Sequence, residues 1–274
     1  MEHFDLKTYL RRINYSGSTA PTLATLNGLT EAHTRTIPFE NIDVILNRKI
    51  LLSDDALFQK LVVDVRGGYC FEQNGLFLRA LSDLGFQAKP ISARVRLRFT
   101  TRSEVAPRTH VFLRVEIGNE SFLTDVGMGA GSLTKALVLR TDEEQKTPHD
   151  TRRLCKEGAL WYHQIRYGEV WQDACEFTLE EMPLIDREVA NWYTSTHPQS
   201  HFRDKLVAAR ALENGSRISL QNDEFTIRKS SGEAEKKKLQ SHDEIINVLT
   251  SDFGIRLSSD DREHLKFVDL FKGL

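Results

Sequence analysis

Apolar residues recur every three or four positions through the first third of this chain. The pattern covers residues 4–13, 23–32, 56–65 and 71–84, and such spacing places the apolar side chains on one face of a helix. Acidic residues at the start of the third segment and Gly85 after the fourth are typical helix boundaries. The sequence therefore predicts a helical N-terminal part.

From about residue 89 the apolar period changes to two, which places successive side chains on opposite faces of a strand. The alternation occurs in six segments, at residues 91–99, 111–117, 121–126, 136–139, 160–167 and 170–177. This middle part is predicted to form a sheet or a barrel.

The last third has a mixed pattern. Residues 217–220 and 224–228 are typical of a hairpin, and residues 245–253 and 264–271 are typical of helices. The lysine-rich stretch at residues 229–238 is predicted to be a solvated loop. A small α/β unit is therefore expected to close the chain.

Composition and charge argue against several classes of protein. The chain has 274 residues, 40% of them hydrophobic, with 37 Lys and Arg against 39 Asp and Glu. A net charge of -2 does not favour a nucleic-acid surface. No apolar run is long enough to span a membrane, and the first residues lack the pattern of a secretory signal. We therefore expect a cytoplasmic protein with neither a nucleic-acid nor a membrane partner.

The three cysteines leave one unpaired in any disulfide scheme, and their spacing fits no zinc site. Free thiols are expected, and no metal is implied. Cys155 and Cys175 lie in predicted strands and are most simply buried apolar residues. Cys70 differs because a glycine pair precedes it and a predicted helix follows it, so the positive end of the helix dipole would stabilise its thiolate. Cys70 is a candidate nucleophile, although taken alone it could also be a small buried residue.

A predicted hairpin brings a histidine and an aspartate together. If residues 118–119 form a two-residue turn, Phe112 lies opposite Asp125. His110 is two residues from Phe112 on the same strand, so His110 and Asp125 become diagonal neighbours on one face of the sheet. A shift of the register by one residue would separate them.

A cysteine, a histidine and an aspartate divide the work of nucleophilic catalysis. The imidazole takes the proton of the thiol, and the carboxylate orients the ring and favours its protonated form. Single cysteines and histidines are more often structural, so the hypothesis depends on Cys70, His110 and Asp125 acting together.

Four motifs carry a resemblance to a known family. They are Ile-Pro-Phe-Glu-Asn at residues 37–41, Arg-Gly-Gly-Tyr-Cys-Phe-Glu-Gln-Asn at 66–74, Pro-Arg-Thr-His at 107–110 and Asp-Val-Gly at 125–127. Their order and spacing resemble those of the arylamine N-acetyltransferases of the prokaryotic branch. The resemblance implies an α+β fold with a cysteine-protease-like arrangement. Its three parts would be a helical bundle at residues 1–86, a β-barrel at 87–185, and a linking segment with an α/β lid at 186–274.

The resemblance also implies an activity. Cys70 would be the nucleophile, His110 its base and acid partner, and Asp125 the orienting carboxylate. The enzyme would transfer an acetyl group from acetyl-CoA, its co-substrate, to small aromatic amines and hydrazines. The mechanism would be ping-pong through an acetyl-cysteine, in a protein that is a monomer or a homodimer.

Binding residues follow from the same motifs. The small-residue loop after Asp125 is expected to offer backbone N–H groups to the pyrophosphate of coenzyme A, although such glycines most often only make a turn. The expected coenzyme A contacts are Thr109, Gly127, Gly129, Ala130, Gly131 and Ser132. The expected contacts of the acceptor amine are Phe39, Tyr69 and Met128.

Two of these residues need comment. Met128 stands where the family usually has an aromatic residue, so a flexible thioether replaces one stacking surface. Tyr69, like Phe39, could equally be an ordinary core aromatic. Glu40 and Arg66 are expected to form a partly buried pair that holds the loop before Cys70.

The segment at residues 191–202 is most simply a structural loop, although its Trp192, His197 and His201 could contact coenzyme A. Three other functions stay open. A cysteine hydrolase or transglutaminase-like enzyme would use the same three residues on an amide donor, an amide synthase would use another thioester, and a binding module would use none of them.

Overall fold

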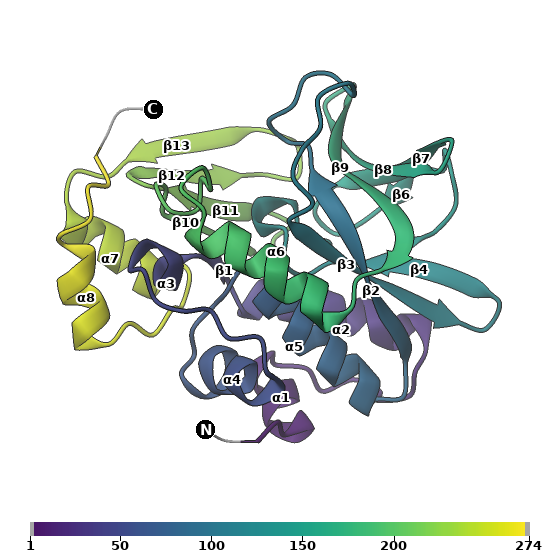
Figure 1. Cartoon of the computed structure of the whole chain (residues 1–274), viewed down its shortest axis with the longest axis horizontal. Helices are drawn as coiled ribbons and strands as arrows, with labels where there is room; N and C mark the ends of the chain where they lie inside the picture. The colour runs from purple at the N-terminus through teal and green to yellow at the C-terminus, as the bar shows by residue number, and fades with distance from the viewer. Residues whose placement is uncertain (1–2, 272–274) are drawn as a thin grey trace.

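The computed structural model describes residues 3–271 of the chain. Figure 1 shows three groups of elements, with helices at the bottom, a large sheet at the right and a smaller sheet at the upper left. The helices of the first group are α1 (Leu6–Arg12), α2 (Leu23–Thr36), α3 (Ile42–Ile45), α4 (Asp54–Phe58), the π-helical turn η1 (Gln59–Val63) and α5 (Cys70–Asp83). Across the described part of the chain, no helix is long and apolar enough to cross a membrane.

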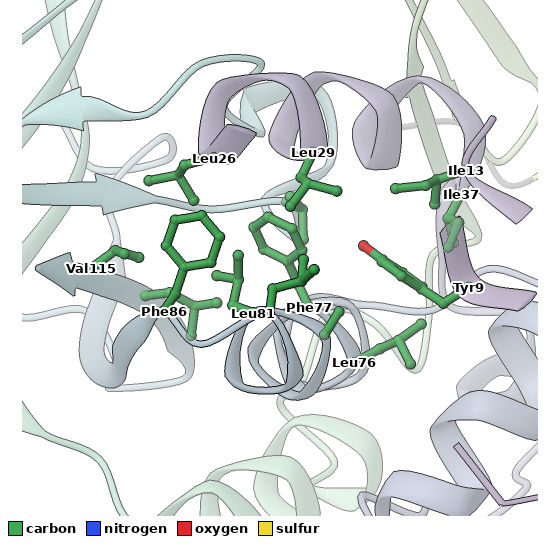
Figure 2. Packing of buried hydrophobic residues seen from close by; sticks show 14 of the residues in the cluster. Tyr9, Ile13, Leu26, Leu29, Ile37, Leu76, Phe77, Leu81, Phe86 and Val115 are labelled. Carbon is green, nitrogen blue, oxygen red and sulfur yellow. The ribbon is translucent and has the colours of Figure 1, made fainter. Parts of the chain in front are cut away.

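A core of apolar side chains fills the space between α2 and α5. Figure 2 shows Leu26 and Leu29 of α2 facing Phe77 and Leu81 of α5. All four are completely buried, and burial of a side chain of this size stabilises the fold by about 1.5–3 kcal/mol. This packing fixes α5, and with it Cys70, against the rest of the chain.

An eight-stranded antiparallel sheet forms the second group, with the strand order β5-β4-β3-β2-β9-β8-β7-β6. Its strands are β2 (Gln87–Val95), β3 (His110–Ile117), β4 (Glu120–Thr124), β5 (Leu137–Val138), β6 (Gln145–Lys146), β7 (Thr151–Glu157), β8 (Leu160–Tyr167) and β9 (Val170–Glu181). The hairpin of β3 and β4 has Ile117 opposite Glu120 and Leu113 opposite Thr124. The register predicted from a two-residue turn is therefore confirmed, and Asp125 directly follows the paired residues.

The third group is a five-stranded sheet with the order β1-β10-β11-β12-β13. It contains β10 (Val207–Ala211), β11 (Arg217–Gln221), β12 (Glu224–Arg228) and β13 (Ala234–Lys238), with α7 (His242–Ser251) and α8 (Ser259–Leu265) beside it. Its first strand, β1 (Phe39–Glu40), comes from the N-terminal part and pairs with β10. The sheet thus connects the loop that precedes Cys70 to the last third of the chain.

The α+β fold class is confirmed, but several local predictions are wrong. The stretch at residues 229–238 is not only a loop, because it contains the exposed edge strand β13, and lysines are common at such an edge. The last helix, α8, lies earlier than the predicted residues 264–271. The segment at 191–202 begins within a helix, α6 (Leu184–Thr196). The buried face of α6 includes Asn191 and Thr194, so polar residues mask its helical apolar period.

Two glycines before Cys70 are required by close packing. A Cβ atom on Gly67 would lie 2.1 Å from the carbonyl oxygen of Pro38, and one on Gly68 would lie 2.8 Å from a carboxylate oxygen of Glu72. Real Cβ atoms essentially never approach other atoms so closely. The glycine pair therefore allows this loop to lie against β1 and the first turn of α5.

A buried ion pair holds the same loop. Arg66 donates to Glu40 Oε1 from Nε at 3.1 Å and from Nη2 at 2.9 Å, and the Glu40 side chain is completely buried. The other carboxylate oxygen of Glu40 accepts a hydrogen bond from the N–H of Ile42 at 2.6 Å. The predicted pair is present and is more deeply buried than expected. Arg66 also lies 3.5 Å from Asp261 of α8 and thereby connects the loop to the C-terminal helices.

We predict that Arg66→Met destabilises the protein by about 3–5 kcal/mol, because it leaves the Glu40 carboxylate buried without its ion-pair partner. Urea unfolding followed by circular dichroism would measure the change. Arg79→Met is the matched control, since the ion pairs of Arg79 with Asp54 of α4 and Asp83 of α5 are largely exposed and their loss should cost no more than about 1 kcal/mol. Equal losses in the two variants would contradict the prediction.

Candidate active site

Cys70 is the first residue of α5, and Tyr69 is its N-cap. The Tyr69 N–H donates to Glu72 Oε2 at 3.0 Å, which closes the first turn of the helix. The thiol lies 3.6 Å from the carbonyl oxygen of Thr109 and is almost completely buried. The N–H of Cys70 makes no hydrogen bond within residues 3–271, as is usual at a helix start. The nucleophile candidate thus sits where the sequence predicts, next to a free backbone donor.

His110 and Asp125 meet as the hairpin geometry predicts. His110 is the first residue of β3, and its Nε2 lies 2.7 Å from Asp125 Oδ2. Both side chains are at least 98% buried, with 2% and 1% of their side-chain surface exposed. A buried carboxylate this close to an imidazole orients the ring and favours its protonated form.

Asn74 is a supporting residue to which the sequence analysis assigned no role. It lies one helical turn after Cys70, and its Nδ2 donates to Asp125 Oδ1 at 2.8 Å and to the Val111 carbonyl at 2.9 Å. Its Oδ1 accepts from the N–H of Val126 at 3.0 Å. The i, i+4 spacing from Cys70 could have indicated that the two side chains share a helix face. Asn74 joins the helix that begins at Cys70 to β3 and to the segment after β4.

The pKa values of the pair follow from burial and charge. Burial alone would lower the pKa of His110, but the charge and hydrogen bond of Asp125, helped by the Cys70 thiol, raise it to about 10. Burial would raise the pKa of Asp125, but His110, Asn74 and the N–H of Gly127 together lower it below its ordinary value. At neutral pH the pair is therefore an imidazolium next to a carboxylate.

A cleft of about 530 Å³ opens onto Cys70 and His110. Its predicted lining residues are Phe39, Thr109, Gly127, Met128, Gly129, Ala130 and Gly131. Tyr69 and Ser132 are not among the lining residues, and Tyr69 is completely buried, with its hydroxyl bonded to Asn191 of α6. Tyr69 is therefore placed in the core rather than in the wall of the cleft.

Several lining residues were missed because they come from segments far apart in the sequence. They include Leu97, Arg98 and Phe99 after β2, Phe202 after α6, and Ala209, Ser219 and Gln221 of the five-stranded sheet. Of the three residues named for the segment at 191–202, His201 lines the cleft, whereas Trp192 and His197 do not. No motif or period connects these residues, since only the packing of the three groups brings them together.

The small-residue loop at residues 127–132 uses most of its own N–H groups. The N–H of Gly127 donates to Asp125 Oδ1 at 2.8 Å, that of Met128 to the Ser132 hydroxyl at 2.9 Å, and those of Gly131 and Ser132 to carbonyls of the loop. Only the N–H groups of Gly129 and Ala130 lack a partner within residues 3–271. Of the backbone N–H groups expected to bind the pyrophosphate of coenzyme A, two therefore remain available.

Gly127 has a second, structural role. A Cβ atom there would lie 2.7 Å from the Cα of Cys70 and 2.9 Å from Asn74 Nδ2. Glycine at this position lets the loop pack directly on the first turns of α5. Its place in the Asp-Val-Gly motif therefore has a packing reason that is independent of any ligand.

The three cysteines differ in their burial. Cys70 and Cys175 are buried, whereas Cys155 is half-buried and lies 3.8 Å from the guanidinium of Arg102. The expectation of a simply buried residue is thus right for Cys175 and wrong for Cys155. Met128 packs its sulfur 3.2 Å from that of Cys175, so its side chain is held in the cleft wall.

Among residues 3–271 there is no group of three or more His, Cys, Asp or Glu side chains that could hold a metal ion.

Comparison with known proteins agrees with the fold and the motifs. A sequence model described as N-acetyltransferase matches residues 22–262. The chain is 39% identical to the arylamine N-acetyltransferase of Escherichia coli over 264 residues, which cover 96% of this chain and 92% of that protein. The chain therefore belongs to the arylamine N-acetyltransferase family, and it is an acyltransferase of that family.

Solved structures agree. The arylamine N-acetyltransferase of Mycobacterium tuberculosis superposes with a TM-score of 0.91 at 36% identity and covers 96% of this chain and 100% of that one. The enzyme of Mycobacterium marinum, solved in complex with CoA, also has a TM-score of 0.91 at 36% identity, with 96% and 97% covered.

The raised pKa of His110 predicts how the free energy of unfolding changes with pH. The pKa of His110 in the folded protein, about 10, lies above its ordinary value of 6.5, so protonated His110 stabilises the fold. This contribution is complete below pH 6.5 and is lost as the pH rises through 10. In Asp125→Asn it should be missing, because burial alone lowers the pKa of His110.

The gap in unfolding free energy between the wild type and Asp125→Asn should therefore shrink between pH 6.5 and pH 10. Urea unfolding at several pH values would measure it. Asp186→Asn, which changes an exposed carboxylate, serves as the control and should show no such trend. A gap that stays constant across this range would refute the assignment of an imidazolium.

Proposed function

We propose that this protein transfers an acetyl group from acetyl-CoA to small aromatic amines and hydrazines through an acetyl-cysteine intermediate on Cys70. The observation that carries the proposal is the buried His110–Asp125 pair at 2.7 Å beside Cys70, at the floor of a cleft. Family membership supports the reaction class. The roles of the individual residues are our assignment.

In the first half-reaction the Cys70 thiolate attacks the acetyl carbonyl of acetyl-CoA. The negative charge that develops on the carbonyl oxygen can be stabilised by the free N–H of Cys70 at the helix start. The bond between the carbonyl carbon and the sulfur of CoA then breaks, and the leaving thiolate takes the proton of His110. The products are CoA as a thiol, neutral His110 and acetyl-Cys70.

In the second half-reaction the amine nitrogen attacks the thioester carbonyl. His110 removes the proton of the amine and becomes an imidazolium again. The carbon–sulfur bond breaks, the acetylated amine leaves, and the Cys70 thiolate is restored. Aromatic amines and hydrazines suit this step because they are largely unprotonated near neutral pH and are therefore nucleophilic.

The cleft offers positive charge and backbone donors to an anionic donor molecule. The N–H groups of Gly129 and Ala130 are unpaired within residues 3–271, and both residues line the cleft. Arg98 also lines it, and within residues 3–271 no ion pair or hydrogen bond of its side chain is found. These groups support binding of the phosphates of CoA. The M. marinum relative was solved in complex with CoA.

The acceptor would lie between Phe39 and Met128, next to the same loop. Phe39 approaches Gly129 closely, since a Cβ atom at that glycine would lie 3.6 Å from its ring. Phe202 extends this apolar wall, with its ring 6.0 Å from that of Phe39. An aromatic amine can therefore bury its ring while its nitrogen reaches Cys70.

The experiment that tests the proposal is intact-protein mass spectrometry after mixing with acetyl-CoA, with and without an aromatic hydrazine. We expect a single acetyl adduct that is removed by the hydrazine and is absent in Cys70→Ala. If neither an adduct nor an acetylated hydrazine forms, acetyl-CoA is the wrong donor. The amide synthase and the hydrolase would then be tested with other thioesters and with a peptide amide.

Asp125→Asn should slow the acetylation of Cys70 by roughly 10³–10⁴-fold, because the ring loses its orientation and its counter-charge. The rate of adduct formation in a rapid-quench experiment would measure the loss, and circular dichroism would confirm that the variant is folded. A folded variant with nearly normal acetylation would remove Asp125 from the mechanism.

A further inference from the structure

Arg152 is a buried cation that the mechanism above does not use. It lies on β7, its side chain is completely buried, and it is one of the two largest side chains in the interior. Its guanidinium forms a bidentate ion pair with Asp150, with Nε 2.5 Å from Oδ1 and Nη2 2.6 Å from Oδ2. The neighbouring Arg153 lies on the other face of the strand, over the ring of Trp171.

The remaining nitrogen of Arg152 points toward the small-residue loop. Nη1 donates to the carbonyl oxygen of Gly131 at 3.0 Å and lies 3.1 Å from His163 Nε2. Burial and the charge of Arg152 lower the pKa of His163 to about 3, so this imidazole is neutral and its Nε2 can accept the hydrogen bond. The guanidinium of Arg152 therefore attaches the loop at residues 127–132 to strand β7.

Two further contacts extend the network. Asp150 Oδ2 also accepts from Arg217 Nη2 of β11 at 2.8 Å, so the same carboxylate connects β7 to the five-stranded sheet. On the other side, the ring of Phe112 lies between the rings of His163 and His110, at 6.0 and 5.0 Å from their centres. The cluster of Arg152, Asp150, Arg217 and His163 thus lies between the loop, the candidate triad and the smaller sheet.

Stability alone does not explain a buried ionic cluster, because apolar residues of the same volume often replace such clusters at no loss. The contact with Gly131 suggests another reason. The loop consists mainly of small residues. Gly129 and Ala130, whose N–H groups have no partner within residues 3–271, both line the cleft. Without an external anchor such a loop would sample other conformations and bind an anion less tightly.

We propose that Arg152 is a positioning residue: by holding the Gly131 carbonyl, it fixes the loop in the conformation that presents the N–H groups of Gly129 and Ala130 to the phosphates of the acetyl donor. This inference rests on the proposed function, because it requires that the donor carries phosphates. Arg152 itself touches neither substrate.

The test compares two acetyl donors in the full-length protein. Acetyl-CoA carries phosphates, whereas p-nitrophenyl acetate acetylates a thiolate without them. We expect Arg152→Met to raise the KM for acetyl-CoA by about tenfold. Its loss of kcat/KM with acetyl-CoA should exceed its loss with p-nitrophenyl acetate by a similar factor. Arg153→Met is the matched control. It should change neither the KM for acetyl-CoA nor the ratio of the kcat/KM values for the two donors.

Arg152→Lys keeps the test decisive if Arg152→Met does not fold. A lysine retains the charge opposite Asp150, but it lacks the planar fork that reaches Asp150, Gly131 and His163 together. It should show the same preference for the phosphate-free donor, to a smaller extent. Equal losses with both donors, or no loss with either, would overturn the inference. A wild-type protein that acetyl-CoA does not acetylate would instead overturn the proposed function, so the two failures are distinguishable.

Discussion

The candidate site depends on how the buried charge of Asp125 is balanced. A carboxylate without partners would be strongly destabilising in the interior. Here His110 supplies a positive charge, while Asn74 and the N–H of Gly127 supply hydrogen bonds to the other oxygen. Since these three groups come from β3, α5 and the loop after β4, satisfying one carboxylate fixes the relative positions of all three. Correct positioning of the candidate triad is thus a consequence of burying Asp125 without loss of its hydrogen bonds.

Cys70, the candidate nucleophile, is held by a second set of buried charges. Arg66 and Glu40 fix the loop before Cys70, and Lys60 lies 2.6 Å from both Asp43 and Glu72 just below the first turn of α5. Desolvation makes such charges costly when they are unpaired, so this loop has little freedom to move. Glycines at positions 67 and 127 allow the backbone on both sides of Cys70 to approach within contact distance. Rigid placement of this kind suits a nucleophile that must meet a base and a carbonyl in one geometry.

The same three residues are compatible with transfer of an acyl group to water or to an amine, so the cleft must decide between these reactions. Its walls combine apolar side chains, such as Phe39 and Met128, with the cation of Arg98 and the N–H groups of the small-residue loop. This mixture suits a donor with phosphates and an aromatic acceptor better than an extended peptide, which needs a row of backbone partners. The proposed mechanism therefore depends on the loop conformation for donor choice as much as on the candidate triad for chemistry. Arg152 gives a physical reason why that conformation is held.

Much of the site could be predicted from the sequence because its signals are local. Helical spacing and Gly85 located the Cys70 helix, and the two-residue turn fixed the register that brings His110 beside Asp125. Only the tertiary structure decided the rest. The cleft is formed by β2, the segment after α6 and the five-stranded sheet. Hydrogen bonds that no spacing reveals leave two N–H groups of the loop without a partner in the described part of the chain. No range was predicted for helix α6 or strand β7, because they bury polar residues. Asn191 has its partner Tyr69 far away in the chain, and Arg152 contacts Gly131 of another loop as well as the nearby Asp150. Local periodicity records which face of an element is apolar, whereas the pairing of buried polar groups depends on contacts that exist only after the chain has folded.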